Sequence, residues 1–148
     1  MPKVITLGPV NAEVIIIMAH GAGAGNYSAF MAYYSQQLAD ICYRIVSFNF
    51  DYMQTMLETG KRRPPDRQPK LEAVFTEQIK CAVSSHSNHK HVVLLGKSMG
   101  GKIASFISTK LVRTEKALSI SAVIALGYPF YPAKKVEKFS ARTNHFVD

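Results

Sequence analysis

Short apolar runs alternate with longer amphipathic segments along this chain of 148 residues. Four runs rich in β-branched and aliphatic residues have the length of buried strands, and they cover residues 13–19, 43–50, 91–96 and 121–128. VITLGP, at residues 4–9, is a further short candidate strand. These runs predict a sheet whose strands are mostly buried.

Three segments between these runs have the apolar spacing of helices. The first carries Phe30, Tyr34, Leu38 and Ile41, with Asn26 or Ser28 as candidate N-cap. The second has an apolar stripe made of Leu71, Val74, Phe75, Ile79, Ala82 and Val83. The third runs from Met99 to about Arg113. Alternating strands and helices predict a single α/β domain over residues 1–148, with a mostly parallel sheet and helices on both faces.

Two segments fall outside this alternation. In GKRRPPDRQPK, residues 60–70, three prolines argue against a regular helix or central strand, so we expect a loop. Its position after a parallel strand predicts that it borders the ligand-binding edge of the sheet. We expect Arg63 or Arg67 to pair there with Asp66 or Asp51, and both arginines to contact substrate. The tail, residues 129–148, shows no convincing element.

Composition indicates an ordinary globular protein. Hydrophobic residues make up 47% of the chain and charged residues 19%, which excludes the disordered class. The longest apolar run is far shorter than the roughly 20 residues that span a bilayer, and the chain opens on no signal-peptide pattern. We therefore expect a cytoplasmic protein with no membrane partner.

Charge and cysteine content limit the kinds of partner and metal site that we expect. The formal net charge is +8, but much of it lies in the proline-rich loop without interleaved aromatic residues, so we expect no nucleic-acid partner. The two cysteines have neither metal-type spacing nor a secretory context, which predicts reduced thiols. No cluster of ligating residues indicates a metal, and we expect no cofactor.

The candidate chemistry lies in HVVLLGKSMGGKIAS, residues 91–105, which predicts a strand, a sharp turn and a helix. A phosphate-binding P-loop would need glycine where His91 stands. The other glycine-rich turn, residues 21–25, lacks the third glycine of a dinucleotide fingerprint, because Asn26 occupies that position. Asp51, at the end of the next strand, keeps nucleotide binding open as an alternative.

Gly96 to Gly100 satisfy G-x-S-x-G in the context that a nucleophile elbow needs. Ser98 would project from a strained turn, and Gly100 and Gly101 would leave room for the helix behind it. HGAGAG follows an earlier strand and would supply a second oxyanion donor. The predicted donors are the N–H groups of Met99 and Ala22, with His20 and Gly21 beside the substrate. A simple glycine-rich connector is the alternative interpretation of HGAGAG.

With these motifs the chain resembles the α/β-hydrolase superfamily. More narrowly, it is similar to small bacterial hydrolase-like proteins related to the animal NSL-complex hydrolase-like subunit and its testis-expressed homologue. AHGAGAG, FNFDYM, KRRPPDR, GKSMGGKIAS and LGYPFYP carry this resemblance over residues 19–132. It implies a three-layer sandwich and a serine hydrolase ancestry, but it does not indicate the substrate.

Such hydrolases place an acid and then a histidine on loops after later strands. About two further βα units would follow Tyr128, so we expect the fold to lack its last strands and helices, together with the acid and the base. His145 is the only histidine after Ser98, and we expect His20 to orient backbone and Asp51 to lie far from Ser98. Three hypotheses follow: a serine hydrolase acting on an ester or other acyl substrate, a non-catalytic interaction module, and a nucleotide-binding domain.

The last strand, residues 121–128, has no later strand pattern to cover it. Val123, Ile124, Ala125 and Leu126 make both of its faces apolar, and no lysine or proline within it blocks pairing. Because an open apolar edge strand is a template for another chain, we expect a homodimer or larger assembly through or close to this strand. The tail, residues 129–148, is a candidate segment for crossing to the partner.

Overall fold

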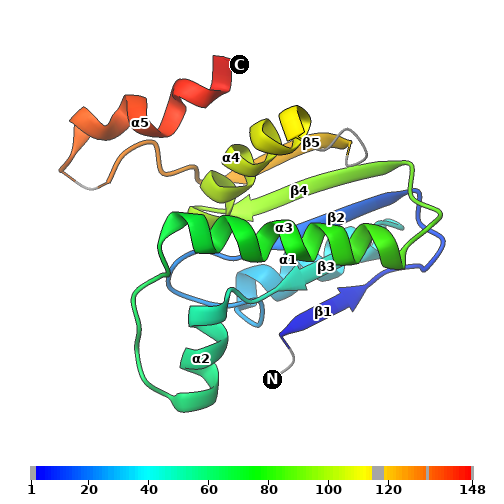
Figure 1. The fold of residues 1–148 in the computed structure, drawn as a ribbon. Helices are drawn as coiled ribbons and strands as arrows, with labels where there is room; N and C mark the ends of the chain where they lie inside the picture. Colours follow the sequence, from blue (N-terminus) through cyan, green and yellow to red (C-terminus); the bar gives the residue numbers. More distant parts are fainter. Residues whose placement is uncertain (1–2, 115–118, 133, 148) are drawn as a thin grey trace.

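Five strands form one sheet in the computed structural model, which describes residues 3–114, 119–132 and 134–147 (Figure 1). Their order across the sheet is β1-β3-β2-β4-β5. The outer strand β1 runs antiparallel to β3, and the other neighbours are parallel. The strands are β1 (Val4–Leu7), β2 (Val14–Ala19), β3 (Arg44–Phe48), β4 (His91–Lys97) and β5 (Ile120–Leu126). The predicted α/β class and the mostly parallel sheet are confirmed.

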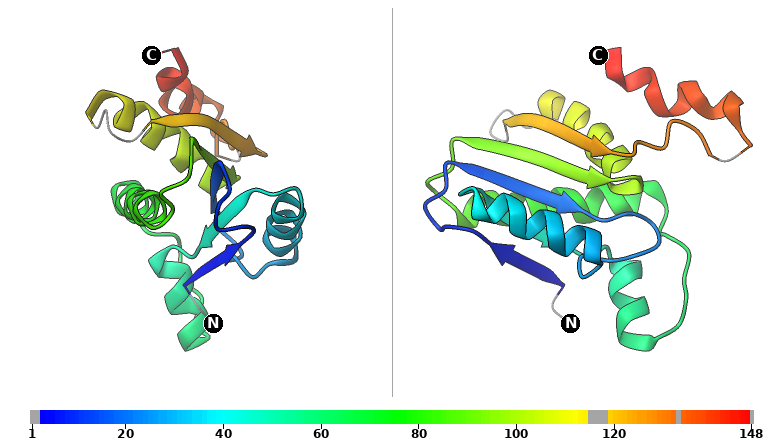
Figure 2. Two further views of the ribbon diagram at one scale, coloured as in Figure 1. Left: turned by 90° about the vertical axis from the view of Figure 1, so that its right-hand side faces the viewer. Right: turned by 180° about the vertical axis from the view of Figure 1, so that it is seen from behind.

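Helices cover both faces of the sheet (Figure 2). On one face lies α1 (Ala29–Asp40), which packs over a core that includes Ile16, Met18 and Leu95. On the other lie α3 (Gln68–Ser85) and α4 (Met99–Thr114), over a larger core of β2, β3 and β4 side chains. Of the two candidate caps of α1, Ser28 is the one that accepts a hydrogen bond, from the Met31 N–H.

One helix was not predicted from the sequence. Residues Asp51–Thr59 form α2, which begins directly after Phe50 and ends at Gly60 in a left-handed conformation. The predicted loop at residues 60–70 is also too long, because α3 already begins at Gln68. Pro69 lies in the first turn of α3, where the missing proline N–H is not needed. The loop that remains covers residues 60–67.

The tail contains short helical elements, although its sequence shows no convincing element. Residues Val136–Lys138 and Asn144–Val147 form 3₁₀ turns on either side of α5 (Phe139–Thr143). The turn Asn144–Val147 lies against α4, where the His145 ring stacks on Phe106 at 3.8 Å between centroids. Tyr128 Oη donates to Arg142 O at 2.6 Å, and Arg142 Nη1 donates to Pro129 O at 2.7 Å. Such contacts between segments leave no periodic pattern in the sequence.

The strand β5 is the sheet edge beside β4, and in the described part of the chain no strand pairs with its outer side. Ala122, Ile124 and Ala125 are exposed, and 42% of the Ile124 surface is open to solvent. Parallel strands are normally covered on both faces. The helix α1 contacts β3 and β1, and Figure 2 shows that it lies away from β5. The apolar side chains of β5 are therefore only partly covered by other elements.

Cys42 and Cys81 are both exposed, free thiols. None of the helices in the described ranges combines the length and the hydropathy that crossing a bilayer requires.

We predict that β5 associates with a second copy of this chain. The Ile124→Lys change puts a charge on the exposed apolar face and should shift the protein to a monomer, measured by light scattering. Ile41→Lys is the matched control, because Ile41 is also exposed but lies at the end of α1. A wild-type monomer at tens of micromolar, roughly the range in which exposed edges associate, would contradict the prediction. The tail would then cover enough of β5 by itself.

Candidate active site

Ser98 lies at the predicted sharp turn, between the end of β4 and the start of α4. Its φ of 49° is in the left-handed region, which costs a residue other than glycine roughly 1–2 kcal/mol. The Ser98 N–H donates to Leu126 O at 2.8 Å, and the Lys102 N–H donates to Ser98 O at 3.0 Å. Hydrogen bonds to the end of β5 and to the first turn of α4 therefore hold this strained conformation.

Three glycines make this turn sterically possible. A Cβ on Gly96 would lie 2.2 Å from the Gly100 carbonyl carbon, and a Cβ on Gly101 would lie 2.8 Å from Gly96 O. A Cβ on Gly100 would lie 2.4 Å from Ala19 O and 2.7 Å from His20 O. The clearance predicted for Gly100 and Gly101 is thus confirmed. The contact of Gly100 with Ala19 and His20 also brings the start of α4 against the end of β2.

The same contact places the HGAGAG loop, residues 20–25, beside the elbow. A Cβ on Gly21 would lie 3.8 Å from Ser98 Cβ, so the structure brings these two residues together as expected. Gly21 is buried, whereas Ala22 is exposed. The oxyanion-donor roles of the Ala22 and Met99 N–H groups stay predictions.

His20 supports this loop from within the protein. Its side chain is 0% exposed, and its Nε2 accepts from the Phe50 N–H at 3.1 Å. The ring proton is therefore on Nδ1, which donates to Gly21 O at 2.6 Å. Burial disfavours the charged ring and lowers the pKa of His20 to about 4. The expected role in orienting backbone agrees with this geometry. The expected substrate contact by His20 does not, since both ring nitrogens bond to main chain.

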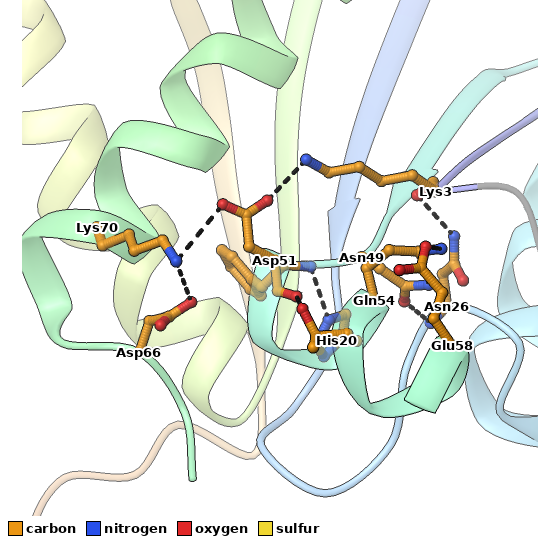
Figure 3. A network of polar contacts seen from close by, with 11 residues as sticks. Lys3, His20, Asn26, Asn49, Asp51, Gln54, Glu58, Asp66 and Lys70 are labelled. Atoms are coloured by element: carbon orange, nitrogen blue, oxygen red, sulfur yellow. Dashed lines mark hydrogen bonds and ion pairs between the residues drawn. The ribbon is translucent and has the colours of Figure 1, made fainter. Parts of the chain in front are cut away.

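Further polar side chains that the sequence analysis missed also hold the loop. Tyr52 Oη donates to Ala22 O at 3.1 Å, and burial raises the pKa of Tyr52 to about 12. Asn49 Oδ1 accepts from the Asn26 N–H at 2.8 Å. Asn26 in turn donates from Nδ2 to Ser47 O at 3.3 Å and to Lys3 O at 3.3 Å, and Figure 3 shows the bond to Lys3. The available signal was FNFDYM itself, because polar residues directly after a buried strand must find partners.

The basic loop lies at the expected edge of the sheet but pairs differently. Figure 1 shows residues 60–67 crossing beyond the carboxyl ends of the central strands. The Asp51 carboxylate accepts from Lys3 Nζ at 2.7 Å and lies 3.7 Å from Lys70 Nζ, which is 3.1 Å from Asp66 (Figure 3). The hydrogen bond with Lys3 is the main cause that lowers the pKa of Asp51.

The predicted pairing of Arg63 or Arg67 with Asp51 or Asp66 is therefore wrong, because these carboxylates pair with Lys3 and Lys70 instead. Lys3 directly precedes β1, and Lys70 lies in the first turn of α3, so the backbone of each lysine is placed by an element of the fold. Arg63 and Arg67 are exposed. Their contact with a substrate stays a prediction.

The structure does not bring a histidine to Ser98 as a general base. His145 Nε2 lies 2.9 Å from Ser105 Oγ, and Ser105 is seven residues beyond Ser98 on α4, about 10 Å along the helix axis. His86, His89 and His91 precede or begin β4, at the opposite end of that strand from Ser98. The chain thus presents the strained turn of Ser98 beside the HGAGAG loop, while the described histidines contact other residues.

Known proteins show what this arrangement is similar to. Residues 12–148 match the family model described as "Alpha/beta hydrolase domain". No curated protein matches the sequence. Among solved structures, a dienelactone hydrolase from Anabaena variabilis has a TM-score of 0.65 and 20% identity, over 82% of this chain and 55% of that one.

Two other solved structures share the fold of this chain over a similar part of its length. A thermostable carboxyl esterase from Bacillus coagulans has a TM-score of 0.66 and 15% identity, over 82% of this chain and 38% of that one. A serine hydrolase without a lid, from Xanthomonas campestris, has a TM-score of 0.61 and 15% identity, over 85% of this chain and 55% of that one. At these identities the likeness shows the fold, and the chain spans about half or less of each structure.

The buried His20 predicts a specific pH dependence of stability. Its pKa is about 4 in the folded protein against an ordinary value of 6.5, so the unfolded chain binds more protons between these values. Stability is therefore complete above pH 6.5 and falls as the pH drops towards 4, by about 3 kcal/mol from this group.

Denaturant unfolding at pH 7, 5.5 and 4 measures this loss. His20→Gln is the matched comparison, because a glutamine amide both donates and accepts hydrogen bonds but does not titrate. We expect the variant to start lower and to lose less stability on acidification. Equal losses in both proteins would show that His20 is not the buried neutral group described above.

Proposed function

Because the chain belongs to the alpha/beta hydrolase domain family, we propose that it is a serine-hydrolase-type protein acting on an ester or other acyl substrate. The observation that carries this proposal is the left-handed φ of Ser98 at a strand-to-helix turn, beside a glycine-rich loop from an earlier strand. Within the family, the motifs of this chain favour the group related to the NSL-complex hydrolase-like subunit.

The proposed first step uses groups at the start of α4. Ser98 Oγ attacks the carbonyl carbon of the substrate, and the carbonyl electron pair moves to its oxygen. The N–H groups of Met99 and Ala22 stabilise this oxyanion, aided by the positive end of the α4 dipole. The oxyanion electron pair then re-forms the carbonyl and the bond to the alcohol oxygen breaks, with the proton lost by Ser98 passing to that oxygen. The acyl group stays on the Ser98 oxygen until water attacks it and releases the acid.

The proton of Ser98 needs an acceptor that the described histidines do not supply. A serine without an adjacent base is a weak nucleophile, although an oxyanion hole and substrate binding alone leave some catalysis. The expected activity of residues 1–148 is therefore low. A complete catalytic triad would require an acid and a base from outside the described residues.

A non-catalytic interaction module is the second candidate, and the open strand β5 favours it. In that case the elbow would persist as part of the fold while β5 binds a partner. No observation favours nucleotide binding, because Asp51 is held in ion pairs with Lys3 and Lys70.

Labelling with a fluorophosphonate probe tests the proposed nucleophile. We expect slow labelling of the wild-type protein that Ser98→Ala abolishes. Ser105→Ala is the matched control, since Ser105 lies on α4, the helix that follows Ser98, and bonds to a histidine, and it should leave labelling unchanged.

Two results would count against the proposal. Labelling that survives Ser98→Ala would assign the reactive serine elsewhere, and a complete lack of labelling would leave the interaction module as the better account. Thermal stabilisation by ATP or NAD without labelling would instead favour nucleotide binding.

A further inference from the structure

An apolar pocket of about 330 Å³ lies between the HGAGAG loop and α2. The loop side contributes residues 23–25 with Tyr27 and Ser28, and α2 contributes Met53, Met56 and Leu57. We infer that this pocket binds the unbranched hydrocarbon chain of the substrate's acyl group, an inference that rests on the proposed function.

The lining fits a hydrocarbon chain and disfavours a charged group. None of the lining residues is ionised at neutral pH, and Ser28 already uses its hydroxyl oxygen to cap α1. Met53 is buried, whereas Tyr27 and Leu57 belong to the exposed large hydrophobic residues. Apolar side chains gathered around a hollow mark a ligand site, and methionines adapt their shape to it.

The loop beside the pocket is held firmly on the α2 side. A Cβ on Gly25 would lie 2.5 Å from Asn49 Oδ1 and 3.0 Å from Met53 Cγ, so the loop backbone packs directly on this wall. The hydrogen bond from Tyr52 to Ala22 fixes the loop to α2 on the elbow side of the pocket. The pocket is therefore formed without the ligand.

The pocket is also within reach of the elbow. Gly21 packs beside Ser98, and Gly23 follows two residues later, so the Gly21 and Gly23 Cα atoms are at most about 7.6 Å apart. A Cβ on Gly23 would meet nothing within 4 Å, so the loop surface is open at this residue of the pocket wall. An acyl chain whose carbonyl carbon lies at Ser98 can cross the loop at Gly23 and enter the pocket. The volume is at the lower end for ligand pockets, which favours a short chain over a bulky ring.

The methionine methyl groups of the intact chain report on occupancy. Titration of the methyl-labelled protein with 1-butanol, 1-hexanol and 1-octanol should shift the Met53 and Met56 signals. Affinity should rise about fourfold for each added methylene until the pocket is full. Leu57→Asp should weaken octanol binding at least tenfold. Val10→Asp is the control, because Val10 is exposed and precedes β2 at the other end of that strand.

Methyl signals that do not move, or that respond equally in Leu57→Asp, would overturn the inference. Fluorophosphonates with methyl and octyl chains separate it from the proposed function. Faster labelling of Ser98 by the octyl reagent, lost in Leu57→Asp, supports both. Labelling without any dependence on chain length keeps the nucleophile and rejects the pocket, whereas alcohol binding without labelling keeps the pocket as a hydrocarbon site and rejects the nucleophile.

Discussion

The close approach of Gly100 to the carbonyl groups of Ala19 and His20 is the contact on which the candidate site depends. It joins the first turn of α4 to the end of β2, two elements that are far apart in the sequence. Because no side chain separates them, the elbow and the HGAGAG loop lie side by side, with Gly21 against Ser98. The strained φ of Ser98 is maintained by the same packing and by its bond to Leu126.

Buried polar bonds then fix the loop that this contact brings to the elbow. His20, Asn49 and Tyr52 all bond to main-chain atoms, and all three are well buried. Such groups are costly to bury unless they are paired, so each one specifies a single position of the loop. The segment after β3 thus serves as a support for the loop after β2. The proposed hydrocarbon pocket uses the outer surface of that support.

Features that depend on local pattern could be predicted from the sequence. The apolar runs predicted the five strands. The glycines at fixed positions around Ser98 predicted the elbow, because only glycine fits where two backbones touch. Features that depend on residues far away in the sequence could not be predicted in this way. The tail is ordered by Ser105 and Phe106 on α4, whereas α2 was missed although Met53, Met56 and Leu57 have helical spacing. Likewise, Lys3 and Lys70 reach Asp51 through the placement of β1 and α3, which no spacing in the sequence reveals.

Comparison of two glycine-to-alanine variants by denaturant unfolding tests the central contact most directly. Gly100→Ala would place a methyl group 2.4 Å from Ala19 O, whereas Gly23→Ala would meet nothing within 4 Å. Since alanine is the better helix former at position 100, any loss there comes from the clash. We expect Gly100→Ala to lower the free energy of unfolding by about 1–3 kcal/mol and Gly23→Ala to change it by less than about 0.5 kcal/mol. An unchanged or raised stability of Gly100→Ala would contradict this account of how the site is built.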